Sequence, residues 1–235
     1  MTGLRALLDS PLVRRLRRPF RLGLSSVRPL STEWGFDRGT PVDRYYIEQF
    51  LAQHAGDIRG RTLEVKSAGY TRQFDRGVTR HDVLDIDAGN ADATIVSDLA
   101  VGEGIPEGQF DCFVLTQTLQ FIYEVRSAIA QSHRLLAPGG VLLATLPVVS
   151  RIAPRYGLET ECWRFTAHGC TRMFGEVFGA EQVTVHSYGN VLAGVAFLRG
   201  AALEELPREK LDVHDPYFPI VVCVRGVKAS ASQGG

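Results

Sequence analysis

Short apolar runs that alternate with helix and turn signals constrain the fold of this chain more than any other feature of its sequence. Most of these runs have few polar positions, which is typical of parallel strands covered by helices on both faces. Residues 125–136 have helical spacing, and the Ala-Pro-Gly-Gly sequence at 137–140 is a helix stop signal. We therefore predict an α/β domain whose strands cover residues 62–67, 81–87, 93–99, 110–118, 141–146, 183–188 and 220–227.

A helix precedes the first predicted strand. Thr40 can cap its start, Pro41 suits the first helical position, and Asp43 favours the positive end of the helix dipole. We expect this helix to end near His54. Three regions follow from these patterns: a basic arm at 1–33, an α/β domain at 34–228 and a flexible tail at 229–235.

The charges of the chain balance, with 26 basic and 26 acidic residues. This balance argues against a protein that binds nucleic acid over its whole surface. Residues 1–30 nevertheless contain seven arginines and one acid, a net charge of 7 − 1 = +6, so the remainder carries −6. Leucines at helical spacing accompany the arginines. The arm is therefore a solvated extension, a foot for a membrane surface or a docking helix for a partner, and the sequence does not choose among them.

The four cysteines are far apart and form no Cys-x-x-Cys pair. This spacing favours buried small side chains in a reducing compartment, and it indicates no metal site. No apolar stretch approaches the roughly 20 residues that cross a bilayer, and the N-terminus lacks the pattern of a signal peptide. We expect a cytoplasmic protein, and its oligomeric state is left open.

Acidic residues follow three of the predicted strands, where an open parallel sheet binds its ligands. Asp85 follows the second strand, and a carboxylate there can accept both hydroxyls of a ribose. Asp98 follows the third strand, where it can accept from an exocyclic amine while the next backbone N–H donates to an adenine ring. Glu64 in the first strand favours an amino-bearing ligand. Together these residues predict a nucleoside site.

The order of these motifs resembles the class I S-adenosylmethionine-dependent methyltransferases of the type 11 kind. The resemblance covers about residues 34–228. A narrower similarity, to a bacterial subgroup often encoded among sugar and polysaccharide biosynthesis genes, is carried by Trp-Arg-Phe-Thr at 163–166 and by residues 34–45. The broader one is carried by residues 62–65, 83–87, 96–99, 110–115 and 135–143.

The resemblance implies a Rossmann-like fold with a seven-stranded, mostly parallel sheet, an antiparallel last strand and helices on both faces. It implies S-adenosylmethionine as the cofactor, with its ribose on Asp85, its adenine on Asp98 and its sulfonium beside Gln117. The loop from Glu64 to Gly69 would hold the methionine end. The implied cofactor residues are Glu64, Lys66, Gly69, Tyr70, Asp85, Asp98, Leu99, Thr116 and Gln117. The gap between Asp85 and Asp98 is too short for the helix that usually joins these strands.

Two departures from the family pattern stand out. The usual first loop, Glu-x-Gly-x-Gly-x-Gly, reads Glu-Val-Lys-Ser-Ala-Gly-Tyr here. Glycine in such a loop permits positive φ and a close approach to the ligand, whereas Lys66 and Tyr70 add bulk. After the fourth strand, Leu-Gln-Phe at 119–121 replaces the usual Leu-Glu-His.

Methyl transfer to a hydroxyl requires alignment and the removal of a proton. His214 beside Asp215 is the candidate base, and the alternative is that the pair forms a turn before the last strand. Residues 148–164 are expected to form a lid over a polar acceptor such as a sugar or sugar phosphate. The candidate acceptor residues are Arg151, Tyr156, Trp163 and Arg164.

The leading hypothesis is thus a methyltransferase that methylates a hydroxyl of a sugar or of a glycosylated small molecule. A second hypothesis is a protein of the same fold that has lost methyl transfer and catalyses another reaction or acts as a docking subunit. A nicotinamide-dependent enzyme is a third, against which the missing Gly-x-Gly-x-x-Gly motif argues. The identity of the acceptor and the choice among O-, N- and C-methylation are left open.

Overall fold

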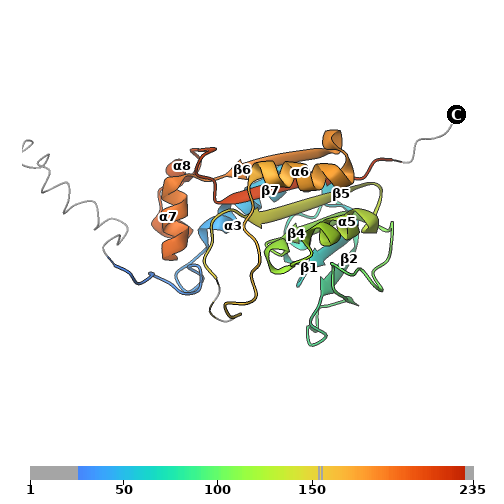
Figure 1. Cartoon of the computed structure of the whole chain (residues 1–235), viewed down its shortest axis with the longest axis horizontal. Helices are drawn as coiled ribbons and strands as arrows, with labels where there is room; N and C mark the ends of the chain where they lie inside the picture. Colours follow the sequence, from blue (N-terminus) through green and yellow to red (C-terminus); the bar gives the residue numbers. More distant parts are fainter. Residues whose placement is uncertain (1–25, 153, 155, 231–235) are drawn as a thin grey trace, which may run out of the picture.

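A computed structural model of the chain describes residues 26–152, 154 and 156–230. It contains one seven-stranded sheet in the order β3-β2-β1-β4-β5-β7-β6 (Figure 1). β7 is antiparallel to both of its neighbours, and the other paired strands are parallel. The strands are β1 (Gly60–Val65), β2 (Val78–Asp85), β3 (Ile95–Val96), β4 (Phe110–Thr116), β5 (Leu136–Pro147), β6 (Val183–Tyr188) and β7 (Val221–Val227).

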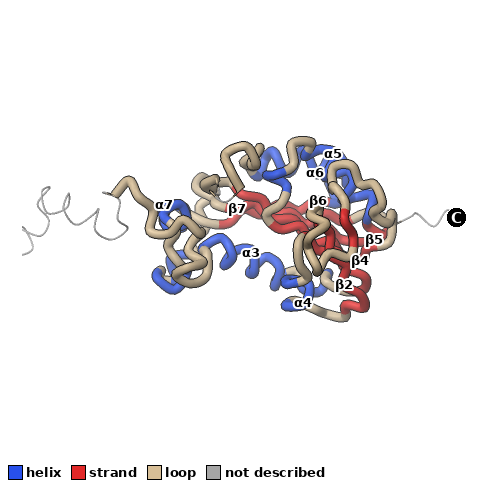
Figure 2. Tube along the Cα trace, turned by 90° about the horizontal axis from the view of Figure 1, so that it is seen from below, coloured by secondary structure: helices blue, strands red, loops and turns tan. Residues whose placement is uncertain are grey.

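Helices cover both faces of this sheet (Figure 2). The α-helices are α3 (Val42–Gln53), α4 (Gly69–Gln73), α5 (Val125–Leu135), α6 (Ala167–Phe178), α7 (Val191–Arg199) and α8 (Arg208–Leu211). Short 3-10 turns are η1 (Ala55–Asp57), η2 (Leu119–Phe121), η3 (Ala180–Gln182) and η4 (Leu203–Glu205). No helix joins β2 to β3, as the short gap between them predicts. The fold class expected from the sequence is confirmed.

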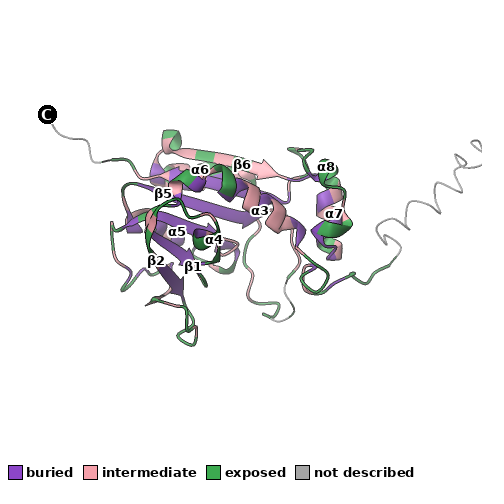
Figure 3. Cartoon of the chain, turned by 180° about the vertical axis from the view of Figure 1, so that it is seen from behind, coloured by how far each residue is buried: buried purple, intermediate pink, exposed green. Residues whose placement is uncertain are grey.

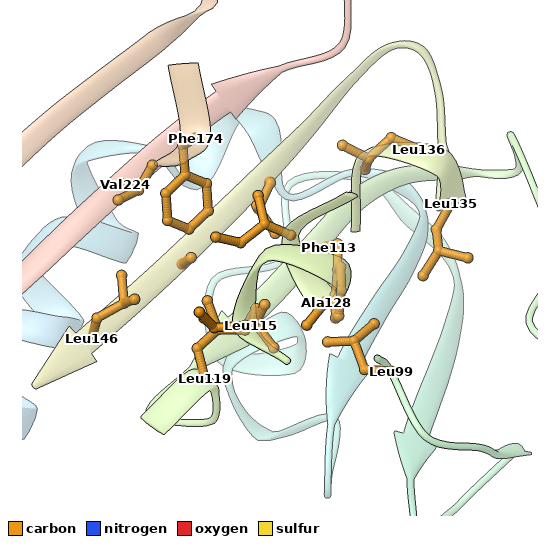
Figure 4. Close-up of a cluster of buried hydrophobic side chains, with 14 of the residues drawn as sticks. Leu99, Phe113, Leu115, Leu119, Ala128, Leu135, Leu136, Leu146, Phe174 and Val224 are labelled. Carbon is orange, nitrogen blue, oxygen red and sulfur yellow. The ribbon is translucent and has the colours of Figure 1, made fainter. Parts of the chain in front are cut away.

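Alternate residues of β4 enter two separate hydrophobic cores. Phe113 and Leu115 pack with α5 and α6 on one face (Figure 4). Cys112 and Val114 pack with α3 and α7 on the other face. Because both faces are buried, the strand needs apolar side chains at nearly every position, which is the pattern that the sequence shows. Figure 3 shows the contrast between the buried central strands and the more exposed edge strand β6.

The Pro-Gly-Gly sequence lies inside β5, and this corrects the predicted start of that strand at residue 141. α5 ends at Leu135 and β5 begins at Leu136. The ladder between β4 and β5 shifts register between Phe110 and Cys112. A Cβ on Gly140 would lie 2.7 Å from the carbonyl oxygen of Phe110, so only glycine lets the two backbones approach so closely.

The start of α3 also differs from its prediction. Thr40 does not cap the helix, because Pro41 occupies the N-cap position. The Thr40 hydroxyl instead donates to Glu204 in η4 (2.8 Å), and the Thr40 N–H donates to the same carboxylate (2.9 Å). The contact therefore fixes the start of α3 to η4, which lies far along the sequence.

Residues just before the predicted domain boundary at residue 34 contact the α/β domain. The Leu30 N–H donates to the Arg199 carbonyl at the end of α7 (2.7 Å), and Ser31 is buried. The Ser31 hydroxyl accepts from the Glu33 and Gly35 N–H groups. Residues 26–31 therefore contact the C-terminal end of α7, while the arginine-rich part of the predicted arm before Ser26 lies outside the described residues.

Three of the cysteines are buried, as expected, and Cys162 is exposed, which is not. Burial raises the pKa of the Cys170 thiol to about 12, so that side chain stays protonated. Within the described part of the chain, no helix has the length and apolar character needed to cross a membrane.

Candidate functional site

The strand order reverses between β1 and β4, with β2 and β3 on one side and β5, β7 and β6 on the other. Open α/β sheets bind ligands beyond the carboxyl ends of the strands at such a switch point. The loops after β1, β2 and β4 meet there. Their side chains decide what this position can bind.

Glu64 organises the loop after β1. Its side chain is buried, and its two carboxylate oxygens accept from the backbone N–H groups of Tyr70 (3.1 Å) and Thr71 (2.8 Å). Burial raises the pKa of Glu64 above its usual range, and the two N–H donors oppose that shift. Glu64 thus holds the first turn of α4 in place, and its role toward an amino-bearing ligand stays a prediction.

Lys66 occupies the position of the first glycine of the family loop and keeps a glycine-like backbone. Its φ is +70°, in the left-handed region that side chains disfavour. Its N–H donates to the Leu84 carbonyl in β2 (3.0 Å). Its ammonium lies 3.4 Å from the hydroxyl of Tyr156 and 5.3 Å from the centre of that ring. Lys66 therefore adopts a backbone conformation that suits glycine, and a cationic side chain extends from it.

Gly69 and Tyr70 lie in the first turn of α4. A Cβ on Gly69 would contact only the Ser67 hydroxyl, at 3.6 Å, so no close backbone approach requires glycine there. The Tyr70 ring stacks on Phe74, with a centroid distance of 6.4 Å, and lies 5.8 Å from the Arg44 guanidinium. The bulk of Tyr70 is thus directed toward α3, contrary to the expectation that it crowds the loop.

Asp85 ends β2 with its carboxylate held from two directions. One oxygen accepts from the Asp87 N–H (3.1 Å), and the other accepts from the side-chain amide of Asn90 (2.7 Å). The same amide donates to the Lys66 carbonyl (2.8 Å), so Asn90 joins the loops after β1 and β2. Burial would raise the pKa of Asp85, but these donors outweigh it and the net shift is downward. Asp85 is therefore ionised at neutral pH.

Asn90 is the member of this arrangement that sequence reasoning missed. The only local signal is the turn at residues 87–90, where the Asn90 N–H donates to the Asp87 carbonyl (3.1 Å). A turn residue of this kind usually bonds to its own neighbours, and nothing in the pattern indicates a partner on another loop.

Asp98 and Leu99 follow the two-residue strand β3. One Asp98 oxygen accepts from the Ala100 N–H (2.8 Å), and the side chain is half-buried. The Leu99 side chain is buried in the core below the sheet, where Figure 4 labels it. Only the backbone of Leu99 is thus available for the predicted contact with an adenine ring.

Thr116 and Gln117 end β4 in an unusual conformation. Gln117 has a φ of +46°, and its N–H donates to the Thr145 carbonyl in β5 (2.9 Å). Its carbonyl accepts from the Gln120 amide (2.9 Å). The other side-chain atom of Gln120, its Oε1, is buried and has no hydrogen-bond partner among the described residues. The turn after β4 is therefore tightly shaped and retains an unused acceptor.

Comparisons with known proteins agree with this geometry. Residues 70–144 match the family model "Methyltransferase domain". An S-adenosylmethionine-dependent methyltransferase from Archaeoglobus fulgidus is similar over 79% of this chain and 94% of its own, with 10% identity and a TM-score of 0.53. The N-methyltransferase NodS from Bradyrhizobium japonicum WM9, solved with S-adenosyl-L-homocysteine, covers 81% and 89%, with 16% identity and a TM-score of 0.51. This chain has the class I methyltransferase fold.

A third solved structure with this fold has a different activity. The [4+2]-cyclase SpnF is similar over 94% of this chain and 95% of its own, with 15% identity and a TM-score of 0.51. No curated protein sequence matches the chain. At these identities the structural similarities establish the methyltransferase fold. The reaction has to be inferred from the residues of the site.

In the long segment between β5 and α6 of this methyltransferase fold (Figure 1), the Trp-Arg-Phe-Thr motif makes contacts within the protein. The Trp163 indole donates to the Ile122 carbonyl (3.0 Å), and its ring stacks on Tyr123 at 5.9 Å. Arg164 pairs with the buried carboxylate of Glu161 (2.7 Å). Phe165 is buried, and the Thr166 hydroxyl caps α6. The motif shapes the segment, and its contact with an acceptor stays a prediction.

Arg151 and Tyr156, the other two candidate acceptor residues, lie apart in this segment. The Arg151 guanidinium lies 4.1 Å from the centre of the Trp34 ring and donates to the Thr32 carbonyl. Tyr156 packs edge-on against Phe121 in η2, with a centroid distance of 5.8 Å. Tyr156 also contacts Lys66 in the loop after β1.

His214 and Asp215 lie at the far edge of the sheet. Asp215 is a turn residue: its N–H donates to the Gly189 carbonyl (3.0 Å), and its carboxylate accepts from the Tyr217 N–H (3.0 Å). His214 lines a pocket of about 440 Å³ between α3 and β6, together with Tyr46, Gln49, His186, Tyr188 and Asp212. β5 and β7 separate β6 from β4, so the structure does not bring this pair to the switch point. The turn interpretation of Asp215 is confirmed, and a role as base loses its geometric support.

Proposed function

We propose that the protein is an S-adenosylmethionine-dependent methyltransferase that methylates a hydroxyl group of a sugar or of a glycosylated small molecule. The observation that carries the cofactor part is the Asp85 carboxylate. It is ionised, it is fixed by Asn90 and the Asp87 N–H, and it stands at the end of β2 beside the switch point of a methyltransferase fold.

The residues present fit this cofactor. One Asp85 oxygen accepts from the Asp87 N–H and the other from the Asn90 amide, and the carboxylate retains accepting capacity, which suits the two hydroxyls of a ribose. Asp98 likewise uses one oxygen for the Ala100 N–H, which leaves the other for an exocyclic amine. Lys66 preserves the positive φ that a glycine would give the first loop. These side chains are held in place before any ligand enters, which lowers the entropic cost of binding.

When bound, S-adenosylmethionine would supply an electrophilic methyl group for an in-line displacement. The contribution of the chain is then to align the acceptor and to exclude water. Gln117 and Tyr156 flank the switch point from the β4 and β5 sides, and we assign both to this alignment. His214 can remove the proton only from an acceptor that reaches from the switch point to the β6 edge.

Two aromatic pairs support a sugar acceptor. Phe121 packs against Tyr156, and Tyr123 stacks on Trp163, so rings from the turn after β4 meet rings from the segment after β5. All four side chains are partly exposed, from 37% for Trp163 to 70% for Tyr123. Exposed aromatic faces beside polar groups are suited to a ring that has apolar C–H faces and hydroxyl edges.

Calorimetry with S-adenosylhomocysteine tests the cofactor part. We expect the wild-type chain to bind it and the Asp85→Ala variant to lose about 100-fold in affinity, because two charge-assisted hydrogen bonds disappear. Asp92→Ala, which removes an exposed acid from the same turn, is the matched control and should bind like the wild type. A folded wild-type sample that shows no binding at millimolar ligand would sink the proposal. Uptake of labelled methyl groups by a panel of sugars then tests the acceptor.

A fold that has lost methyl transfer is the second candidate function. The lysine at the first glycine position favours it, and the cyclase with the same fold shows that this architecture hosts other catalysis. The double variant Lys66→Gly, Ala68→Gly separates the two candidates. If S-adenosylhomocysteine binds only after glycine is restored, the native chain is not a methyltransferase.

A further inference from the structure

Lys66 holds a backbone conformation that lysine disfavours. Its φ of +70° would be free of strain for glycine, which is the residue expected at this position of the loop. Strained residues of this kind persist at functional positions, where the surrounding structure enforces them. The strained backbone therefore points to a function of the lysine side chain that glycine cannot perform.

The Lys66 side chain extends over the end of β4. Lys66 follows β1, while its partner Tyr156 belongs to the segment after β5, and β4 lies between these two strands. The long separation of 3.4 Å between the ammonium and the Tyr156 hydroxyl indicates a weak bond to a neutral group. The Lys66 side chain is exposed, so its charge is accessible to a ligand at the switch point.

The charges around Lys66 explain what it would attract. Burial would raise the pKa of Asp85, and the charge of Lys66 is one of the interactions that outweigh this effect, so the two side chains share one electrostatic environment. Glu64 and Asp98 add further negative charge at the neighbouring strand ends. A ligand with a carboxylate would be repelled by these acids unless a cation receives it. Lys66 brings that cation on a flexible stem.

We propose that Lys66 binds the carboxylate at the methionine end of the cofactor, exchanging its weak contact with Tyr156 for a charge-assisted one. This inference rests on the proposed function. Ammonium–carboxylate hydrogen bonds are about twice as strong as neutral ones, so the exchange favours the ligand. The first loop would then hold the ligand through a side chain at the position where the family pattern has glycine.

Calorimetry on the full chain with two ligands tests this assignment. S-adenosylhomocysteine carries the carboxylate, and 5′-methylthioadenosine keeps the nucleoside and the sulfur but lacks the amino-acid end. We expect Lys66→Gly to bind S-adenosylhomocysteine about 10-fold or more weakly and 5′-methylthioadenosine as the wild type does. Glycine relieves the strained φ, so a folding defect does not account for the loss. Lys66→Arg keeps the charge and should retain most of the affinity.

Three outcomes would overturn the assignment. If Lys66→Gly binds S-adenosylhomocysteine as tightly as the wild type, the lysine does not receive the carboxylate. Equal binding of both ligands by the wild type leads to the same conclusion and leaves the proposed function standing. A third titration uses S-adenosylmethionine: if Lys66→Gly binds this ligand alone more tightly than the wild type does, the lysine acts on the sulfonium. Failure of the wild type to bind any of these ligands would instead remove the proposed function itself.

Discussion

The turn after β2 and the segment after β5 both carry residues that the sequence singles out, yet they use their polar groups in opposite ways. Asp85 is fixed by two donors and keeps accepting capacity toward the switch point. Arg164 instead pairs with Glu161, and the Trp163 indole donates to the Ile122 carbonyl. A motif residue that keeps a hydrogen-bond acceptor or donor without a protein partner is a candidate for ligand binding. A motif residue whose hydrogen bonds are all made within the chain maintains the fold.

The largest effect is expected from Phe165→Ala. This side chain is buried in the core shared with α5 and α6, so its truncation leaves a cavity. We expect the free energy of unfolding to fall by about 3–5 kcal/mol. Urea denaturation measures the loss, with Phe165→Leu as the milder control. If the variant binds S-adenosylhomocysteine as the wild type does, under conditions where it is folded, the motif belongs to the fold.

Arg164→Ala is expected to destabilise the chain less, by about 2 kcal/mol, because the guanidinium is partly exposed. The change removes the cation 2.7 Å from the buried Glu161 carboxylate. Thermal unfolding measures it, and Arg172→Ala on the exposed surface of α6 is the control. If Arg164→Ala kept its stability and instead raised the KM for a sugar acceptor, Arg164 would be a ligand-binding residue and not one that maintains the fold.

Asn90→Ala should weaken ligand binding more than it lowers the stability of the fold. It removes the two hydrogen bonds that the amide donates, to the Asp85 carboxylate and to the Lys66 carbonyl, and the one that its oxygen accepts from the Asp92 N–H, and it leaves the cores intact. We expect an affinity for S-adenosylhomocysteine about 10-fold lower and a stability loss of about 1 kcal/mol. Calorimetry and urea denaturation on the same sample give both values. A large stability loss with unchanged affinity would show that this turn, too, serves mainly the fold.

The smallest effects are expected from pH, and they have opposite signs for two carboxylates. The raised pKa of Glu64 gives stability that is complete below its ordinary value of 4.5 and is lost as pH rises through the native pKa. The lowered pKa of Asp85 gives stability that is present above 3.8 and is lost as pH falls through the native pKa. Urea denaturation from pH 3 to 8 measures the free energy of unfolding against pH. The fall with rising pH should disappear in Glu64→Gln, and the fall with decreasing pH should disappear in Asp85→Asn.

The strands and the three acids could be predicted because each depends on a local pattern. The two-face burial of β4 forces a continuous apolar run, and β6 has the bounds that its alternation predicts. Asp85 and Asp98 are recognisable because a strand end fixes their position. Their positions follow from the fold.

Contacts between distant segments could not be predicted from local patterns. Thr40 has the sequence signature of a cap, but a carboxylate 164 residues further along the chain takes its hydroxyl. Lys66 meets Tyr156 across 90 residues, and Asn90 bonds a carbonyl on another loop. The Pro-Gly-Gly sequence signals a stop, yet the close approach of β4 turns it into the first part of β5. In each case a tertiary partner outweighs the local preference.

The contacts of residues 30–34 have a practical consequence for anyone who shortens this protein. A chain that begins at Trp34 would lose the Thr32 carbonyl that receives Arg151, and it would lose the Leu30 N–H bond to the end of α7. The first loss falls on the segment that carries Tyr156, and the second falls on the end of α7. A shortened chain should therefore keep Ser26 and all residues after it, so that residues 26–33 still contact the segment after β5 and the end of α7.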